Sequence, residues 1–125
     1  MRLLGIDYGS RRIGLALSDE AGGFAFPHSV VRAGKTALAA VARVCSENSV
    51  GKIVMGESRD YHGAPNSIMP AAVRFAEALG VATGLPVVFE KEFLTTREAA
   101  HIQGEHAEID ASAAALILKS YIDRQ

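Results

Sequence analysis

Apolar and polar positions alternate at the start of the chain and predict three β-strands there. Residues 3–7 run apolar as far as Asp7, residues 13–18 place Ile and Leu at every second position, and residues 24–31 carry Phe and Val around Pro27. Alternation with period two is typical of a strand with one buried face, and Pro27 interrupts the third strand. Because only short polar turns separate these segments, they predict an antiparallel meander.

The period changes after residue 34, where apolar residues begin to recur every three or four positions. This spacing predicts helices, and the short apolar runs between them predict buried strands. A capping-box pair, Thr95 and Glu98, predicts one more helix start. The predicted helices are residues 35–48, 68–83 and about 109–122, and the predicted strands between them are residues 52–56 and 85–89.

Length and composition fit one globular domain. The chain has 125 residues, of which 49% are hydrophobic and 22% charged, and both values are ordinary for a folded domain. The predicted order of elements, β-β-β-α-β-α-β-α-α, is that of a mixed sheet with helices on its faces. We therefore expect a single α/β domain that covers residues 1–125.

The net charge of the chain does not by itself indicate a nucleic-acid partner. The formal net charge is −1, whereas proteins that bind phosphates usually carry a basic excess. The total hides an asymmetry, because residues 1–60 hold eight Lys or Arg and six Asp or Glu, whereas residues 61–125 hold five and eight. Near-neutrality is thus compatible with a nucleic-acid substrate and predicts weak, salt-sensitive binding.

Cysteine usage and hydropathy indicate the compartment. The single Cys45 lies in an apolar helical stretch, where we expect a buried free thiol in a reducing environment. No apolar run reaches the ~18 residues of a membrane span. The N-terminus turns polar at Asp7 without the pattern of a signal peptide. These features predict a cytoplasmic protein with no membrane partner.

Asp7 is the first candidate functional residue. It ends an apolar strand and is followed by Gly9 and Gly14. A buried strand tolerates a carboxylate only when the charge is paired or holds a metal, and glycines let a backbone or a phosphate come close. The alternative is a turn aspartate that caps a tight hairpin.

Further acids follow other predicted elements. Glu57, Glu90 and Glu92 come directly after apolar strands, and the carboxyl ends of parallel strands gather at one edge of a sheet. For Glu90 and Glu92 the commoner case is a solvated strand end beside Lys91. Asp110 heads the last helix, where an N-cap is the plain interpretation.

Asp110 has a second interpretation that depends on packing. It shares a helical stripe with Ala114, Ile117 and Tyr121. If that stripe packs on the sheet, Asp110 faces the edge where Asp7 ends.

Four blocks of the sequence stand out together. They are residues 5–19, which begin Gly5-Ile6-Asp7-Tyr8-Gly9-Ser10-Arg11-Arg12-Ile13-Gly14, then Ile53-Val54-Met55-Gly56 followed by Gly63 and Phe75-Ala76-Glu77-Ala78-Leu79, then Glu92-Phe93-Leu94-Thr95-Thr96-Arg97-Glu98-Ala99, and last residues 109–121. In this order they resemble the YqgF/RuvX family of Holliday-junction-resolvase-like proteins, regarded as pre-16S rRNA nucleases. The resemblance spans nearly the whole chain. It implies a ribonuclease H-like fold, with a five-stranded mixed sheet whose first three strands are antiparallel and which is flanked by helices.

The resemblance also implies site residues and a cofactor. Asp7, Glu92 and Asp110 would form a catalytic acidic triad that holds one or two Mg²⁺ or Mn²⁺ ions, which activate a water and stabilise the leaving oxygen of a phosphodiester. Glu57 is a candidate further ligand. Candidates for substrate binding are Gly9, Arg11, Arg12, Arg59 and Arg97.

The chain departs from the family pattern around two of these acids. Lys91 stands where the family usually has Asp, and Phe93 stands where it has Arg. The segment 103–108 is short and acidic where the family has a long basic stretch. These departures weaken the expectation of tight nucleic-acid binding.

The leading functional prediction is a metal-dependent endonuclease that acts on structured RNA, by resemblance in 5′-end processing of pre-16S rRNA on a ribosomal particle. It would act as a monomer or homodimer. The alternatives are a Holliday junction resolvase, which needs two sites on a symmetric dimer, and a non-catalytic RNA or protein adaptor. A small-molecule phosphotransferase is a further alternative, although such enzymes close two domains of this kind around ATP.

Overall fold

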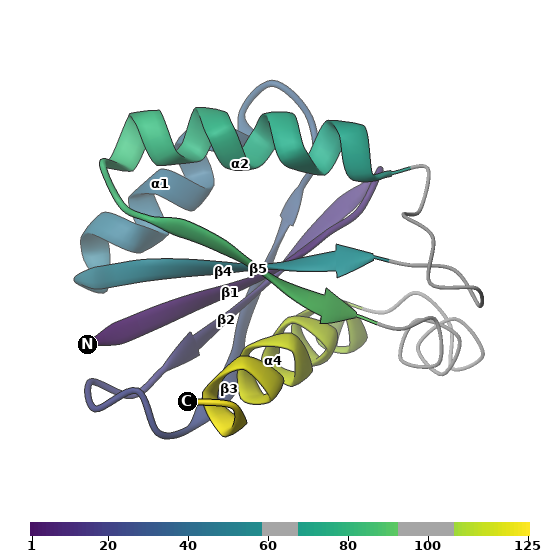
Figure 1. Ribbon diagram of the computed structural model, residues 1–125. Coiled ribbons are helices and arrows are strands. Elements are labelled where there is room, and N and C mark those ends of the chain that lie inside the picture. The colour runs from purple at the N-terminus through teal and green to yellow at the C-terminus, as the bar shows by residue number, and fades with distance from the viewer. Residues whose placement is uncertain (59–67, 93–106) are drawn as a thin grey trace.

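The computed structural model describes residues 1–58, 68–92 and 107–125, with the side chains of Ser58, Glu92 and residues 107–110 left undescribed. It contains a five-stranded sheet of order β3-β2-β1-β4-β5 (Figure 1). The first three strands are antiparallel, and β4 and β5 run parallel to β1, so the predicted meander and mixed sheet are confirmed. The strands are β1 Arg2–Tyr8, β2 Arg12–Ser18, β3 Ala25–Arg32, β4 Val50–Ser58 and β5 Val87–Glu92.

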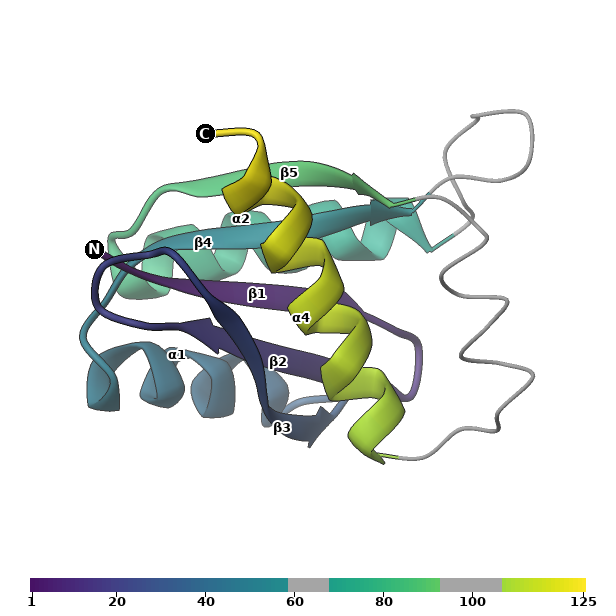
Figure 2. The ribbon, with the colours of Figure 1, turned by 90° about the horizontal axis from the view of Figure 1, so that it is seen from below.

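Helices cover both faces of the sheet. In Figures 1 and 2, α1 and α2 lie on one face and α4 crosses the other. Each strand sends alternate side chains into one of the two helical layers. Leu4 and Ile6 of β1 pack under α1 and α2, whereas Leu3 packs with Leu118 of α4. The helices are α1 Ala37–Glu47, α2 Met69–Thr83 and α4 Ala107–Asp123.

Several element boundaries differ from the predicted ones for local reasons. The last strand begins at Val87 rather than residue 85. Before it, α2 ends at Gly84, which has a positive φ of 70°, and the Pro86 carbonyl accepts a hydrogen bond from the Ile53 amide. The last helix begins two residues earlier than predicted, at Ala107. The predicted start at Thr95 and Glu98 lies outside the described residues.

Pro27 is accommodated because β3 is an edge strand. The register between β2 and β3 shifts next to it, so that Leu15 pairs with Ser29 but Ala16 pairs with Pro27. A proline is tolerated at such an edge bulge because its missing N–H breaks no central ladder. None of the helices in the described residues is long and apolar enough to cross a bilayer.

Cys45 is a buried free thiol, as predicted. It is 4% exposed on the inner face of α1, and burial raises the pKa of the thiol from 9.0 to about 11. Since the thiolate is the reactive species, Cys45 should react with a thiol reagent at pH 8 at least ~100-fold more slowly in the native protein than in denaturant. Stopped-flow labelling with and without guanidinium measures this ratio, and similar rates in both would contradict the buried placement.

Candidate functional site

Asp7 is a buried carboxylate at the edge where the parallel strands end. The carboxyl ends of β1, β4 and β5 point to the same side of the molecule (Figure 1). Asp7 is the last residue but one of β1, and only 7% of its surface is exposed. A carboxylate removed from water in this way needs compensating partners or a cation. The strand ends of open α/β sheets are also where ligands bind.

Glycines occupy the sheet positions on both sides of Asp7. Gly14 of β2 is its register partner. In β4, Met55 pairs with Ile6, so Gly56 is the next position in register and lies beside Asp7. Gly56 in turn pairs with Glu90 of β5. Because neither neighbour of Asp7 in this row carries a side chain, nothing in the row competes with a ligand for the space beside the carboxylate.

The backbone of α4 brings position 110 to the same edge as Asp7. A Cβ on Gly5 would lie 2.9 Å from the Ala114 carbonyl oxygen, so α4 rests directly on β1 there. Asp110 precedes Ala114 by four residues, about 6 Å along a helix. Asp7 follows Gly5 by two residues, about 6.6 Å along a strand. Since α4 runs opposite to β1 (Figures 1 and 2), both steps lead to the same end of the sheet.

The helical stripe on which the second interpretation of Asp110 depends packs on the sheet. Ala114 and Ile117 are buried against the sheet, and Tyr121 is partly buried beside them. The Tyr121 hydroxyl accepts a 3.1 Å hydrogen bond from Lys52 Nζ of β4. This packing supports the interpretation that places Asp110 toward the edge of Asp7.

The third predicted acid also belongs to this edge. Glu92 is the final residue of β5, and its backbone pairs with Ser58 at the end of β4. The positions of Asp7, Glu92 and Asp110 therefore share one end of the sheet. Among the side chains that the structure describes, no three His, Cys, Asp or Glu form a metal-binding group. The acidic triad stays a prediction, and its oxygen donors suit Mg²⁺.

Glu57 lies on the opposite face of the sheet from Asp7. Its neighbours Ile53 and Met55, at alternate positions of β4, pack under α1 and α2, whereas Val54 packs under α4. Alternation gives Glu57 the face of Ile53 and Met55. Asp7 shares a face with Gly5, which contacts α4. The register thus argues against Glu57 as a ligand shared with Asp7.

Glu90 is buried, and the prediction of a solvated strand end is wrong for this residue. It is 3% exposed. Its carboxylate accepts hydrogen bonds from Arg124 through Nη2 and, at 3.2 Å, through Nε, and from Ser120 Oγ at 2.7 Å. The hydrogen bonds and charge of Glu90 raise the pKa of Arg124. No local pattern identifies this pair, because its members are separated by 34 residues.

The Glu90–Arg124 ion pair links the C-terminal end of α4 to β5. We expect Arg124→Ala to shift the urea midpoint of unfolding to a lower concentration, because the buried Glu90 carboxylate loses its charged partner, although Arg124 itself is exposed. Lys119→Ala is the matched control, since it breaks an exposed ion pair with Asp123 on the same helix and should change stability by less than about 0.5 kcal/mol. Urea titrations compare the two. Equal losses of stability in the two variants would show that the burial of the Glu90 carboxylate adds nothing to the strength of its ion pair.

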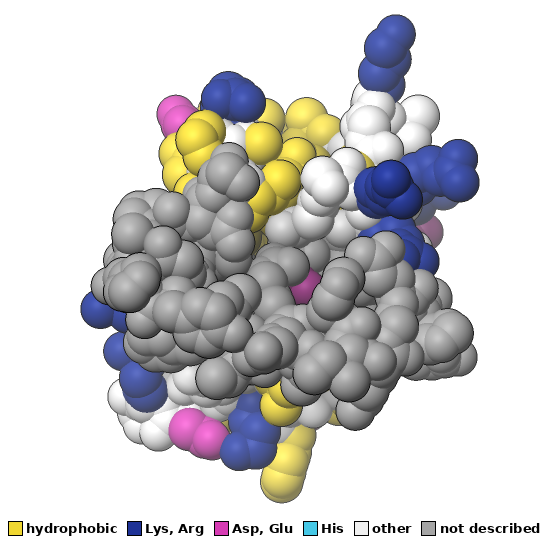
Figure 3. Space-filling view, turned by 90° about the vertical axis from the view of Figure 1, so that its right-hand side faces the viewer, with side chains coloured by type: hydrophobic (Ala, Val, Ile, Leu, Met, Phe, Trp, Pro, Cys, Tyr) yellow, Lys and Arg dark blue, Asp and Glu magenta, His cyan; other side chains and the backbone are white. Residues whose placement is uncertain are grey.

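The predicted phosphate-binding residues are only partly described. Arg11 is exposed in the turn between β1 and β2, and Arg12 begins β2 at the same edge as Asp7. Close packing of the backbone requires a glycine at position 9, because a Cβ there would lie 2.6 Å from the Arg12 carbonyl oxygen. Arg59 and Arg97 lie outside the described residues. Figure 3, which faces this edge, shows several Lys and Arg side chains at the upper right, others along the left and lower margins, and an acidic side chain near the centre.

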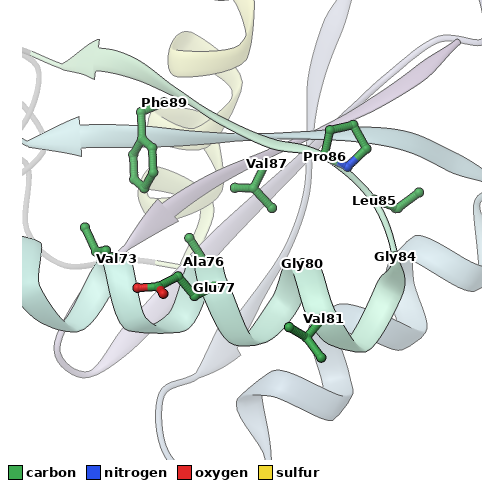
Figure 4. A pocket seen from close by; sticks show the side chains of 10 residues that line it. All are labelled: Val73, Ala76, Glu77, Gly80, Val81, Gly84, Leu85, Pro86, Val87 and Phe89. Carbon is green, nitrogen blue, oxygen red and sulfur yellow. The ribbon is translucent and has the colours of Figure 1, made fainter.

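A separate apolar groove lies between α2 and the outer strand β5 (Figure 4). It has a volume of about 750 Å³. Val73 and Ala76 of α2 lie opposite Phe89 and Val87 of β5, with Glu77 at the rim. Val87 and Phe89 belong to the core under α1 and α2, so the groove and Asp7 are on opposite faces of the sheet. The groove is therefore not part of the candidate site.

Curated relatives resemble this chain along nearly its whole length. It is 37% identical over 133 residues to a protein of Syntrophus aciditrophicus (strain SB), covering 98% of this chain and 89% of the relative. It is 41% identical to one of Anaeromyxobacter sp. (strain Fw109-5), covering 98% and 97%. Both relatives carry the name "Putative pre-16S rRNA nuclease".

Solved structures with a similar fold are junction resolvases. Thermus thermophilus RuvC in complex with a Holliday junction substrate has a TM-score of 0.59 and 19% identity, covering 99% of this chain and 95% of that one. The fowlpox virus Holliday junction resolvase has a TM-score of 0.58 and 14% identity over the full length of both chains. These likenesses confirm the predicted ribonuclease H-like fold.

The family assignment joins the sequence blocks to the site. The sequence matches the family described as "RuvX: Holliday junction resolvase" over residues 1–124. That range includes Asp7, the glycines beside it, Glu92 and Asp110. The chain therefore belongs to the RuvX family.

Proposed function

We propose that this protein is a metal-dependent endonuclease that cleaves structured RNA and processes the 5′ end of pre-16S rRNA. The names of its curated relatives and of its family support a nuclease. The RNA substrate is taken from the names of the curated relatives, which are 37% and 41% identical to this chain, whereas the junction resolvases are 14–19% identical to it. Residues 1–125 would act as one domain, in the cytoplasm, on a ribosomal particle.

The observation that carries the proposal is the setting of Asp7. Its carboxylate is buried at the strand ends, flanked in the sheet by Gly14 and Gly56, and shares its edge with the positions of Glu92 and Asp110. Packing alone explains none of this, since an apolar side chain would fill the position with less desolvation penalty. A site that holds a cation offsets the repulsion among acids brought to one edge.

The residues present fit a divalent cation of the Mg²⁺ type. Asp7, Glu92 and Asp110 would hold it through carboxylate oxygens, the donors that Mg²⁺ prefers. When bound, the metal supplies charge stabilisation and an activated water for phosphodiester hydrolysis.

The protein's own elements position the groups around that centre. The sheet fixes Asp7, and α4 carries Asp110. The Glu90–Arg124 pair holds the far end of α4. Arg11 and Arg12 lie where the phosphates of a substrate would approach, and Arg side chains suit them through forked hydrogen bonds.

Cleavage of matched substrates tests this proposal. The purified protein is incubated with an RNA that contains the 5′ leader and mature start of 16S rRNA, and separately with a four-way DNA junction, each with Mg²⁺ or with EDTA. We expect cleavage of the RNA at one position in Mg²⁺, none in EDTA, and little cleavage of the junction. Cleavage of the junction alone would replace this proposal with a resolvase. A protein that binds the RNA but neither cleaves it nor binds Mn²⁺ would be a non-catalytic adaptor, and this proposal would be wrong.

A further inference from the structure

Two arginines from separate strands meet at the edge that carries Asp7. Arg12 begins β2 and Arg32 ends β3, and the two are direct register partners in the antiparallel ladder. The ends of these strands are also joined by a 2.9 Å hydrogen bond from the Ala33 amide to the Arg11 carbonyl. The register therefore brings Arg32, 20 residues away in sequence, beside the predicted phosphate-binding turn.

Strand alternation places this pair on the same face of the sheet as Asp7. Ile13 and Val31, the next register pair, pack into the core under α1 and α2, so Arg12 and Arg32 have the other face. Gly14 has that face as well, and it is the register partner of Asp7. Both arginines therefore flank the candidate site on its own side of the sheet.

Arg12 and Arg32 bring two positive charges directly opposite each other in the ladder. Like charges directly opposite each other in an antiparallel ladder destabilise it. The pair lies at a solvent-facing end of the sheet, with Arg32 exposed. A bound phosphate would convert this repulsion into charge-assisted hydrogen bonds. Figure 3 shows several Lys and Arg side chains at the upper right of this face and others along its left and lower margins.

We infer that Arg32, together with Arg12, binds backbone phosphates that flank the cleaved bond, so that the substrate strand crosses the β2–β3 side of the site. The inference rests on the proposed function. The strand order puts β3 two strands from β1, about 10 Å at the usual spacing. This separation suits a phosphate next to the one at Asp7 and assigns Arg32 to substrate binding rather than to the reacting group.

Salt-dependent binding tests the role of Arg32. A stem–loop RNA with a single-stranded 5′ extension is titrated in Mg²⁺ with Asp7→Asn protein, which we expect not to cleave it, between about 50 and 200 mM salt. Adding Arg32→Ala should weaken binding about 3- to 10-fold and make the slope of log K against log salt shallower by about one. Arg32→Lys should retain most of the slope. Arg74→Ala, an exposed arginine on α2 at the opposite face, should leave both values unchanged.

Two further measurements separate binding from structure. Arg32→Ala should not lower the thermal midpoint, because it removes a like-charge pair. In the wild-type background it should raise KM more than it lowers kcat. An unchanged salt slope, or a loss no larger than that of Arg74→Ala, would overturn the inference even if the protein cleaves RNA. A reduced slope in a protein that cleaves nothing would sustain phosphate binding by Arg32 and refute the nuclease.

Discussion

Replacing Asp7 with Asn should reduce RNA cleavage about 100-fold or more while leaving the chain folded. Asn has the shape of Asp but lacks its charge, so it removes the central anionic ligand from a site that would hold a cation. The metal's charge stabilisation is worth several kcal/mol, and each 1.4 kcal/mol is a factor of about ten in rate. Single-turnover cleavage of the pre-16S RNA in Mg²⁺ measures the loss.

A second readout distinguishes loss of a metal ligand from loss of structure. A metal that binds only the native state raises the thermal midpoint, so Mn²⁺ should stabilise the wild type and not the Asp7→Asn variant. Without metal, the two proteins should unfold at similar temperatures.

Asp19→Asn is the control, because Asp19 lies in the turn that follows β2. Its Oδ1 accepts hydrogen bonds from the Gly23 and Phe24 amides, and Asn keeps an oxygen acceptor there. Equal cleavage by wild type and Asp7→Asn would refute the metal-dependent mechanism.

Gly5→Ala should lower the free energy of unfolding by about 2–3 kcal/mol. An added Cβ would lie 2.8 Å from the Leu118 Cβ and 2.9 Å from the Ala114 carbonyl oxygen. Neither atom is the end of a flexible side chain, so α4 itself must move away from β1. Overpacking of this kind typically costs 1–3 kcal/mol, which corresponds to a fall of roughly 10 °C in Tm for a chain of this size.

The same change should also impair the candidate site. Because α4 carries Asp110, lifting the helix from β1 alters the separation between positions 7 and 110. Gly23→Ala is the matched control, since a Cβ there meets nothing within 4 Å and its φ is not positive. Thermal unfolding and Mn²⁺ binding are measured on both variants. A Gly5→Ala protein as stable as Gly23→Ala would contradict the close packing of α4 on β1.

α4 is the element through which fold and site depend on each other. Its middle rests on Gly5, its C-terminal end is fastened by Arg124 to Glu90, and its first turn contains Asp110. Glu90 lies beneath the far end of this helix and is linked to the candidate site through it. Asp7 and Glu90 lie in one sheet row and on the same face. Ser120 and Arg124 bind the carboxylate of Glu90, whereas glycines flank Asp7 in the sheet.

The sequence by itself determined the strands, the helices and the family. Period-two and helical spacing are local properties of the chain. They were sufficient to predict the meander of β1 to β3 and to show that Ala114, Ile117 and Tyr121 share one helical stripe. Four sequence blocks in the right order, the first of them around Asp7, were sufficient to identify the family. The element ends were less well predicted, because Pro86 and Gly84 favour a turn where β-branched residues alone indicate a strand.

Only the tertiary structure decided which side chains share a site. The register of β4 separates Glu57 from Asp7, and the register of β2 and β3 brings Arg32 beside Arg12. The prediction for Glu90 failed because its partner Arg124 reaches it from the end of α4. Pairings of this kind depend on strand register and helix docking over tens of residues. Local spacing carries no information about them, because the free energy that sets them comes from packing between elements rather than within them.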